Sequence, residues 1–255
     1  ISPRLEGEEM PVDAEGFRKG DRTNIELPKV QKEMVQALKA TGKPVVYVLC
    51  TGSALALNWE EENVDAILNA WYGGQEGGTA VADVLFGDYN PAGRLPVTFY
   101  KSVDQLPDFQ DYSMKGRTYR YMTQEPLYPF GYGLSYTSFV YRNAKLSSTE
   151  IGKADKVTLT VDVENTGKLD GDEVVQVYIK NPNDPEGPLK SLKGFKRVSV
   201  KSGAKQAVSI ELEPKAFYSF NDATQTLEVK AGTYQVLYGG SSADKALQSL
   251  TLKID

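Results

Sequence analysis

The chain has 255 residues, of which 40% are hydrophobic and 25% are charged, so it can bury one or two ordinary cores. Its net charge of -5 and the lack of a long basic run argue against a nucleic-acid partner, and no apolar stretch is long enough for a membrane span. There is no histidine and only one cysteine, Cys50. Histidine-dependent triads and histidine or cysteine metal sites are therefore excluded, and we expect neither a metal nor a cofactor.

The first 27 residues are polar and rich in glycine, proline and glutamate, which predicts a long loop. From Leu27-Pro28 the pattern changes, because apolar residues recur at helical spacing until the sequence Thr-Gly-Lys-Pro at residues 41–44 stops the helix. The residues that give this period are Val30, Met34, Val35 and Leu38.

Two short apolar runs follow, at residues 45–50 and 66–72, and both are typical of strands that are covered on two faces. Cys50 ends the first run, so we expect it to be a buried core residue. A glycine-rich turn at residues 73–78 leads into a helix at residues 79–86, which Gly87 ends. Helices that alternate with buried strands predict an α/β layer with a mostly parallel sheet.

The segment from residue 100 to residue 137 is rich in aromatic residues and proline and has no helical period, so we predict an extended connector. Its aromatic residues either form a sugar-stacking platform or pack as a seam between two layers, and we favour the seam. After Phe139 the sequence alternates with period two, which predicts a sandwich of about seven strands, similar in size to an immunoglobulin or fibronectin type III module.

Clustered carboxylates in the first loop are the best candidates for chemistry. Glu6, Glu8 and Glu9 lie within four residues of one another. Glycoside hydrolysis requires one protonated and one ionised carboxyl group, and neighbouring like charges raise the pKa of one of them. A solvated, inert acidic loop is the alternative. The glycine run at residues 73–78 lacks the lysine of a phosphate-binding loop and is better explained as a backbone turn.

Several motifs occur together in a fixed order. They are WYGGQEGGTAVADVLFGDYNPAGRLPVTF at residues 71–99, GDR at 20–22, LPKVQ at 27–31, RTYRY at 117–121 and PFGYGLSYT at 129–137. Together they resemble the C-terminal half of family 3 glycoside hydrolases. The resemblance implies a partial α/β sandwich domain at residues 1–137 and a fibronectin type III-like sandwich at residues 138–255.

The resemblance also implies a function. The family's general acid/base lies in a Gly-Glu-Gly loop ahead of Asp-Arg, and this residue corresponds here to Glu8. The chain departs from the family pattern, because Glu9 replaces the second glycine and residues 10–19 are inserted before Asp21-Arg22. Glu6 is therefore the runner-up. The family's nucleophilic aspartate belongs to an N-terminal (β/α)8 barrel, for which this chain has no room.

We therefore expect the C-terminal portion of a retaining, exo-acting β-glucosidase or β-xylosidase that is inactive alone. Its partners would be the barrel and a β-linked oligosaccharide or glycoside, and its location periplasmic or secreted. The alternative is a non-catalytic carbohydrate-binding or structural module.

Overall fold

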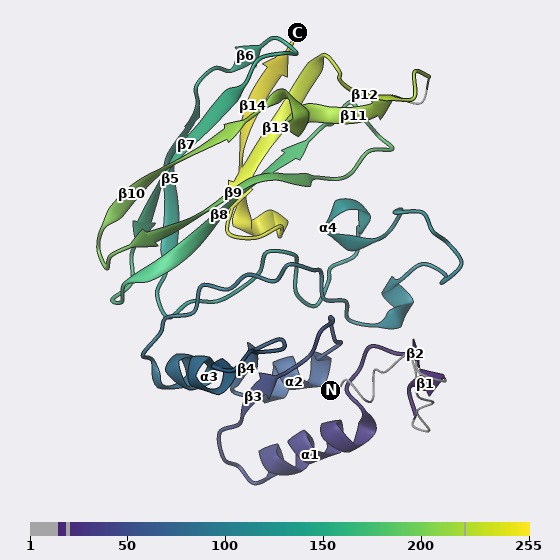
Figure 1. The fold of residues 1–255 in the computed structure, drawn as a ribbon, viewed down its shortest axis with the longest axis vertical. Coiled ribbons are helices and arrows are strands. Elements are labelled where there is room, and N and C mark those ends of the chain that lie inside the picture. The colour runs from purple at the N-terminus through teal and green to yellow at the C-terminus, as the bar shows by residue number, and fades with distance from the viewer. Residues whose placement is uncertain (1–14, 19–20, 222) are drawn as a thin grey trace. The chain divides into compact units, whose positions relative to one another are not determined.

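The computed structural model describes residues 15–18, 21–221 and 223–255, and the chain forms two compact units. The first unit contains the chain up to Asp88 together with residues 97–113 and 124–128. The second contains residues 89–96, 114–123 and 129–255. Figure 1 labels the elements of both units along the chain. The domain boundary predicted between residues 137 and 138 stays a prediction.

The first unit opens with a short antiparallel hairpin of β1 (Phe17–Arg18) and β2 (Asp21–Arg22), within the region predicted to be a loop. Helix α1 (Lys29–Ala40) follows, as its apolar period predicts, and it ends where Thr41 and Gly42 bond back to its last carbonyls. No helix among the described residues is long and apolar enough to cross a membrane.

The α/β layer has a parallel pair of strands, β3 (Val46–Leu49) and β4 (Ala66–Asn69). Helix α2 (Asn58–Asn63) connects them, and α3 (Gly77–Phe86) follows the glycine-rich turn. Gly87 ends α3 in the left-handed conformation at φ +87°, which glycine adopts without strain. The predicted order of elements and the parallel pairing are thus confirmed.

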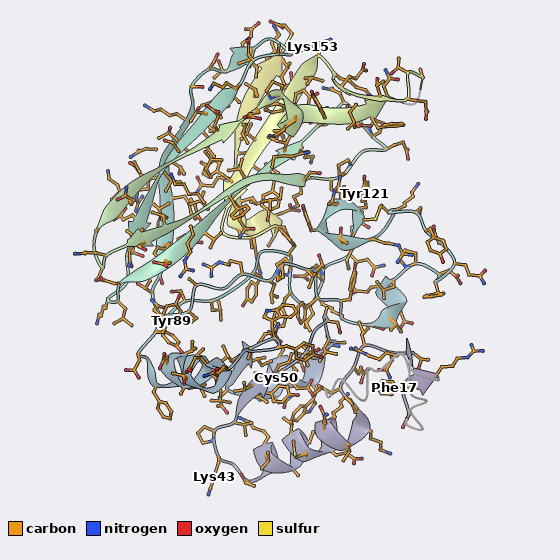
Figure 2. All side chains as sticks on the ribbon, in the orientation of Figure 1. Phe17, Lys43, Cys50, Tyr89, Tyr121 and Lys153 are labelled. Carbon is orange, nitrogen blue, oxygen red and sulfur yellow. The ribbon has the colours of Figure 1, made fainter. Side chains whose placement is uncertain are left out.

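One prediction about burial in this layer is wrong. Cys50 is exposed rather than buried, because β3 ends at Leu49 and the chain leaves the sheet there (Figure 2). The apolar stripe of α1 is also exposed, and Val35 is its only buried member. Among the described residues of this unit, the buried apolar cluster comprises Leu27, Leu49, Leu55 and Leu57.

The second unit is a β-sandwich, as its period-two sequence predicts. Its core has 20 buried residues, and every second residue of its central strand β7 points into it. One sheet has three strands and the other has five, and a separate two-stranded hairpin accompanies them. In sheet order the strands are β10 (Lys205–Leu212), β7 (Val157–Asn165) and β5 (Phe139–Leu146); β6 (Glu150–Ile151), β14 (Leu247–Ile254), β13 (Gly232–Gly239), β8 (Gly171–Lys180) and β9 (Ser191–Val200); and the hairpin β11 (Tyr218–Asn221) with β12 (Thr226–Val229).

Part of the predicted aromatic connector packs on this sandwich. Tyr119 lies in α4 (Thr118–Tyr121), a single helical turn that the sequence did not reveal, and its ring stacks on Phe130 with centroids 4.5 Å apart. The same ring meets Tyr178 of β8 edge-on at 5.7 Å, and its hydroxyl accepts a 3.1 Å hydrogen bond from the Leu192 amide. These aromatic residues therefore pack against protein within the second unit, which favours packing over sugar stacking for them.

Candidate functional site

The two predicted general acids, Glu8 and Glu6, lie outside the described residues. The structure does describe the segment that follows them, from Glu15 into α1 with a gap at residues 19–20, which we call the returning segment. The candidate site is therefore built from this returning segment and from the turn after β3.

Local hydrogen bonds fix the path of the returning segment. The Thr23 amide donates to the Gly16 carbonyl at 2.7 Å, and Gly16 adopts φ +92°, which permits the reversal. The Asn24 side-chain oxygen accepts a 3.1 Å hydrogen bond from the amide of Glu26, two residues further along the chain, and asparagine favours this type of turn. The chain then enters α1 through Leu27 and Pro28.

A second set of bonds ties this segment to the end of β3. Arg22 Nη1 donates to Ser53 Oγ at 2.9 Å, and the Ala56 amide donates to the Ile25 carbonyl at 2.7 Å. Ser53 is itself held by Thr51, a fully buried residue whose Oγ1 accepts from the Ser53 amide at 3.3 Å. Ligands of parallel α/β sheets bind at the carboxyl ends of the strands, and this turn lies at that end of β3.

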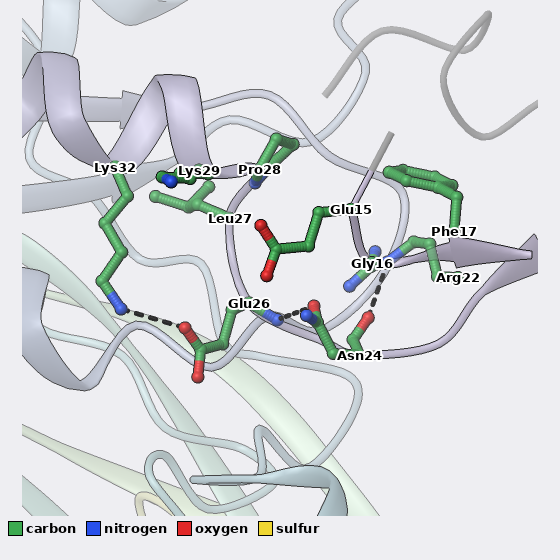
Figure 3. Close-up of a pocket in the computed structure, with 10 residues that line it drawn as sticks. All are labelled: Glu15, Gly16, Phe17, Arg22, Asn24, Glu26, Leu27, Pro28, Lys29 and Lys32. Carbon is green, nitrogen blue, oxygen red and sulfur yellow. Dashed lines mark hydrogen bonds and ion pairs between the residues drawn. The ribbon is translucent and has the colours of Figure 1, made fainter. Parts of the chain in front are cut away.

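The returning segment encloses a cavity of about 230 Å³ (Figure 3). Its lining combines carboxylates, cations, an amide and three apolar side chains. Figure 3 shows the Glu15 carboxylate pointing into the space between the start of α1 and Asn24. The residues that line the cavity are Glu15, Gly16, Phe17, Arg22, Asn24, Glu26, Leu27, Pro28, Lys29 and Lys32.

The charges around the cavity are partly paired with one another. Lys32 Nζ lies 2.9 Å from Glu26 Oε2, and both side chains keep about a third or more of their surface exposed, so the pair adds little stability. Carboxylates, ammonium groups and an amide offer donors and acceptors at short range, which suits a hydroxyl-rich ligand. The sequence indicated this region only through the Asp21-Arg22 and Leu27-Pro28 motifs, and the contributions of Glu15, Asn24 and Glu26 were missed.

Two family models match different parts of the chain. The family model described as the glycosyl hydrolase family 3 C-terminal domain matches residues 2–136, and one described as a fibronectin type III-like domain matches residues 173–242. Over 254 residues the chain is 56% identical to a xylan 1,4-beta-xylosidase of Xylanibacter ruminicola, a match that covers 100% of the chain and 29% of that protein. A periplasmic beta-glucosidase of Salmonella typhimurium is 43% identical, with 87% of the chain and 31% of that protein covered.

A solved structure agrees with these relatives. The crystal structure of beta-glucosidase from Listeria innocua in complex with glucose is 30% identical and superposes with a TM-score of 0.81, covering 92% of the chain and 34% of that structure. Fold and motifs thus match the C-terminal region of proteins named as β-glycosidases. The chain belongs to glycoside hydrolase family 3. It spans about three tenths of the length of the curated relatives named above.

Proposed function

We propose that this chain supplies the general acid/base loop of a retaining, exo-acting β-glycosidase, either a β-glucosidase or a β-xylosidase. Glu8 is the proposed acid/base and Glu6 is the second candidate. The observation that carries the proposal is the family match, which begins at residue 2 and therefore includes the loop that carries both carboxylates. The names of the relatives support both substrate classes.

The proposed reaction needs two carboxyl groups. The protonated acid/base donates its proton to the glycosidic oxygen while a carboxylate nucleophile attacks the anomeric carbon, so the C–O bond breaks and a covalent glycosyl-enzyme forms. The acid/base then accepts a proton from the water that releases the sugar. We propose that an aspartate of an N-terminal (β/α)8 barrel is the nucleophile, and that a β-linked oligosaccharide or glycoside is the substrate.

The described structure supports a specific role for the returning segment. A general acid acts only when its loop is held within hydrogen-bond reach of the leaving oxygen. The bonds of Arg22 to Ser53 and of Ala56 to Ile25 anchor the chain downstream of Glu8 to the α/β layer. We propose a periplasmic or secreted location, because one relative is named a periplasmic enzyme.

The assignment of Glu8 is tested in the complete enzyme with matched variants, Glu8→Gln and Glu6→Gln. A general acid contributes about 10²–10⁴-fold, most visibly when the leaving group is poor. Glu8→Gln should therefore slow the hydrolysis of disaccharides far more than that of activated aryl glycosides, and azide should restore turnover of the aryl substrate. The same pattern in Glu6→Gln but not in Glu8→Gln would reverse the assignment.

A second test uses the 255-residue chain by itself. Without a nucleophile the covalent route is closed, so aryl β-xylosides and β-glucosides should remain unhydrolysed. Turnover at about 1 s⁻¹ or faster, which is in the range of ordinary enzymes, would contradict the proposal that the nucleophile lies outside this chain.

The alternative function is a non-catalytic module that binds carbohydrate or braces the enzyme. The tyrosines of the sandwich strands favour bracing, because Tyr234 and Tyr238 are buried in its core and Tyr178 is buried against the ring of Tyr119. Phe195 of β9 is 69% exposed and is the best stacking candidate on this part of the chain. Retention on xylan or cellulose gels that Phe195→Ala abolishes would establish carbohydrate binding, whereas free passage of the parent chain would support bracing.

A further inference from the structure

Two cations of the second unit lie near each other without an acidic partner among the described residues. The half-buried Arg120 of α4 has its guanidinium carbon 5.6 Å from the centroid of the Tyr121 ring, and its Nε is buried and makes no hydrogen bond within the described part of the chain. Burial first, and then the Arg120 charge, lower the pKa of Lys193 in β9. A buried donor without a partner is costly and like charges repel, so this pair of cations is suited to an anion.

Backbone hydrogen bonds hold α4 beside the start of β9. The Leu189 amide donates to the Arg120 carbonyl at 2.7 Å. The Leu192 amide, in the residue just before Lys193, donates to the Tyr119 hydroxyl at 3.1 Å. The two cations are therefore brought together by fixed backbone contacts, and not only by the flexibility of their long side chains.

An irregularity in β9 sets the direction of the Lys193 side chain. The pairing of β9 with β8 shifts at this point, since Leu192 lies opposite Tyr178 and Gly194 lies opposite Val177, so Lys193 has no opposing residue of its own. Such a β-bulge re-aims a side chain, and bulges are frequent next to binding sites. Lys193 also keeps an exposed surface, so a ligand can reach it.

An exposed aromatic ring lies on the same side of β9 as Lys193. Gly194 faces the sandwich core, because an added Cβ would meet Ile210 at 2.7 Å, so its neighbours Lys193 and Phe195 face outward. Phe195 is 69% exposed. Alternate residues of a strand are about 7 Å apart, a separation that one sugar ring can span.

The nearest carboxylates of the sandwich do not neutralise Lys193. Lys193 lines a cavity together with Glu211 and Glu213. These two carboxylates lie 2.8 Å from other lysines, Glu211 from Lys156 and Glu213 from Lys215. The charge of Lys193 is therefore left for a group that the described chain does not supply.

We propose that Arg120, Lys193 and Phe195 form a binding site for an acidic sugar, a glycan unit that bears a carboxylate, such as a uronic acid. The guanidinium fork matches the two oxygens of a carboxylate, and the ammonium group adds a second charged donor. The Phe195 ring stacks on the C–H face of the sugar, so one apolar surface and two polar groups fix its orientation. This site is separate from the proposed acid/base loop and does not depend on the assignment of Glu8.

The test measures binding of methyl glucuronide and of its neutral analogue methyl glucoside to the complete enzyme by saturation-transfer NMR and calorimetry. Lys193→Gln should weaken binding of the glucuronide about tenfold or more, as expected for the loss of a hydrogen bond between charged groups. The control is Lys196→Gln, which removes the same charge from an exposed position of the same strand and should change nothing. Binding of the glucoside should be the same in both variants.

Two further variants examine the other members of the site. Arg120→Gln should also weaken glucuronide binding about tenfold or more, and Phe195→Ala should weaken it about two- to tenfold. If Arg120→Gln fails to fold, the exposed positions Lys193 and Phe195 still decide the test. The proposal is overturned if the glucuronide does not bind, if Lys196→Gln weakens its binding as much as Lys193→Gln does, or if inorganic phosphate binds as tightly and Phe195→Ala has no effect. None of these readouts measures hydrolysis, so a failed Glu8 assignment would not affect them.

Discussion

A buried ion pair in the second unit allows a quantitative prediction. Arg94 Nη2 lies 3.1 Å from Glu173 Oε1, and the two side chains are only 9% and 7% exposed. The same carboxylate oxygen accepts a 2.8 Å bond from the Val174 amide, and Arg94 Nη1 donates to the Gly93 carbonyl at 3.0 Å. The pair thus attaches the Gly93-Arg94 segment, far upstream in the sequence, to strand β8.

Replacing Arg94 with methionine keeps most of the side-chain volume but leaves the Glu173 carboxylate buried without its cation. Breaking a buried pair in this way costs about 3–5 kcal/mol. For a unit of this size each kcal/mol lowers Tm by about 2–4 °C, so we expect a fall of about 6–20 °C. Burial first, and then the Glu173 carboxylate, raise the pKa of the neighbouring Tyr141.

The assay is thermal unfolding followed by tyrosine near-UV circular dichroism, because Trp59 and Trp71 both lie in the first unit and do not report on the sandwich. Arg142→Met is the control: its pair with Glu164 is 2.7 Å long but 56% and 35% exposed, and such pairs contribute about 0–1 kcal/mol. Equal losses for both variants would refute the reasoning. The double variant Arg94→Met, Glu173→Leu gives a second check, because the effects of a coupled pair are not additive. A loss of stability equal to the sum of the two single losses would also refute the reasoning.

Two further predictions concern one residue in each unit. Gly131→Ala should cost more than about 2 kcal/mol in denaturant unfolding, because its φ is +80° and an added Cβ would collide with the Gln176 amide. The control Gly203→Ala should cost about 1 kcal/mol, because its φ is +70° but the space around it is open. Comparable losses for the two variants would contradict this prediction. Burial first, and then Glu60, raise the pKa of Tyr47 to about 12. The folded state therefore holds this proton more tightly than the unfolded state, so the stabilisation is complete below about pH 10 and is lost as the pH rises towards 12. Tyr47→Phe should weaken the pH dependence of the first unit's unfolding between pH 10 and 12, measured by tryptophan fluorescence, and an unchanged profile would count against it.

The sequence predicted elements best where local chemistry defines them. Helix α1 begins after Pro28 and stops at Thr41-Gly42, as its capping residues indicate. Strand β7 alternates between buried and half-buried residues along its whole length, so its period was readable. Edge strand β9 has mostly exposed or half-buried residues, so its sequence carries little of the alternation that predicts a strand.

Burial was predicted less well than secondary structure, for a physical reason. A periodic pattern shows that a helix has an apolar side, but not which surface covers it, and the stripe of α1 is the example. An apolar run also does not show where its strand ends, so Cys50 was placed inside the core although β3 stops one residue earlier. The cavity residues Glu15, Asn24 and Glu26 come together through turns that no short motif encodes.

The chain alternates between its two units before it settles in the sandwich. Residues 89–96, 114–123 and 129–255 belong to one unit, while residues 97–113 and 124–128 belong to the other. No single cut in the polypeptide therefore separates them: a break after Thr137 would remove Tyr178 from the ring of Tyr119. In evolutionary terms, recombination at one point in the gene cannot exchange the sandwich between relatives without disrupting it, so the two units are expected to be inherited and shuffled as one block.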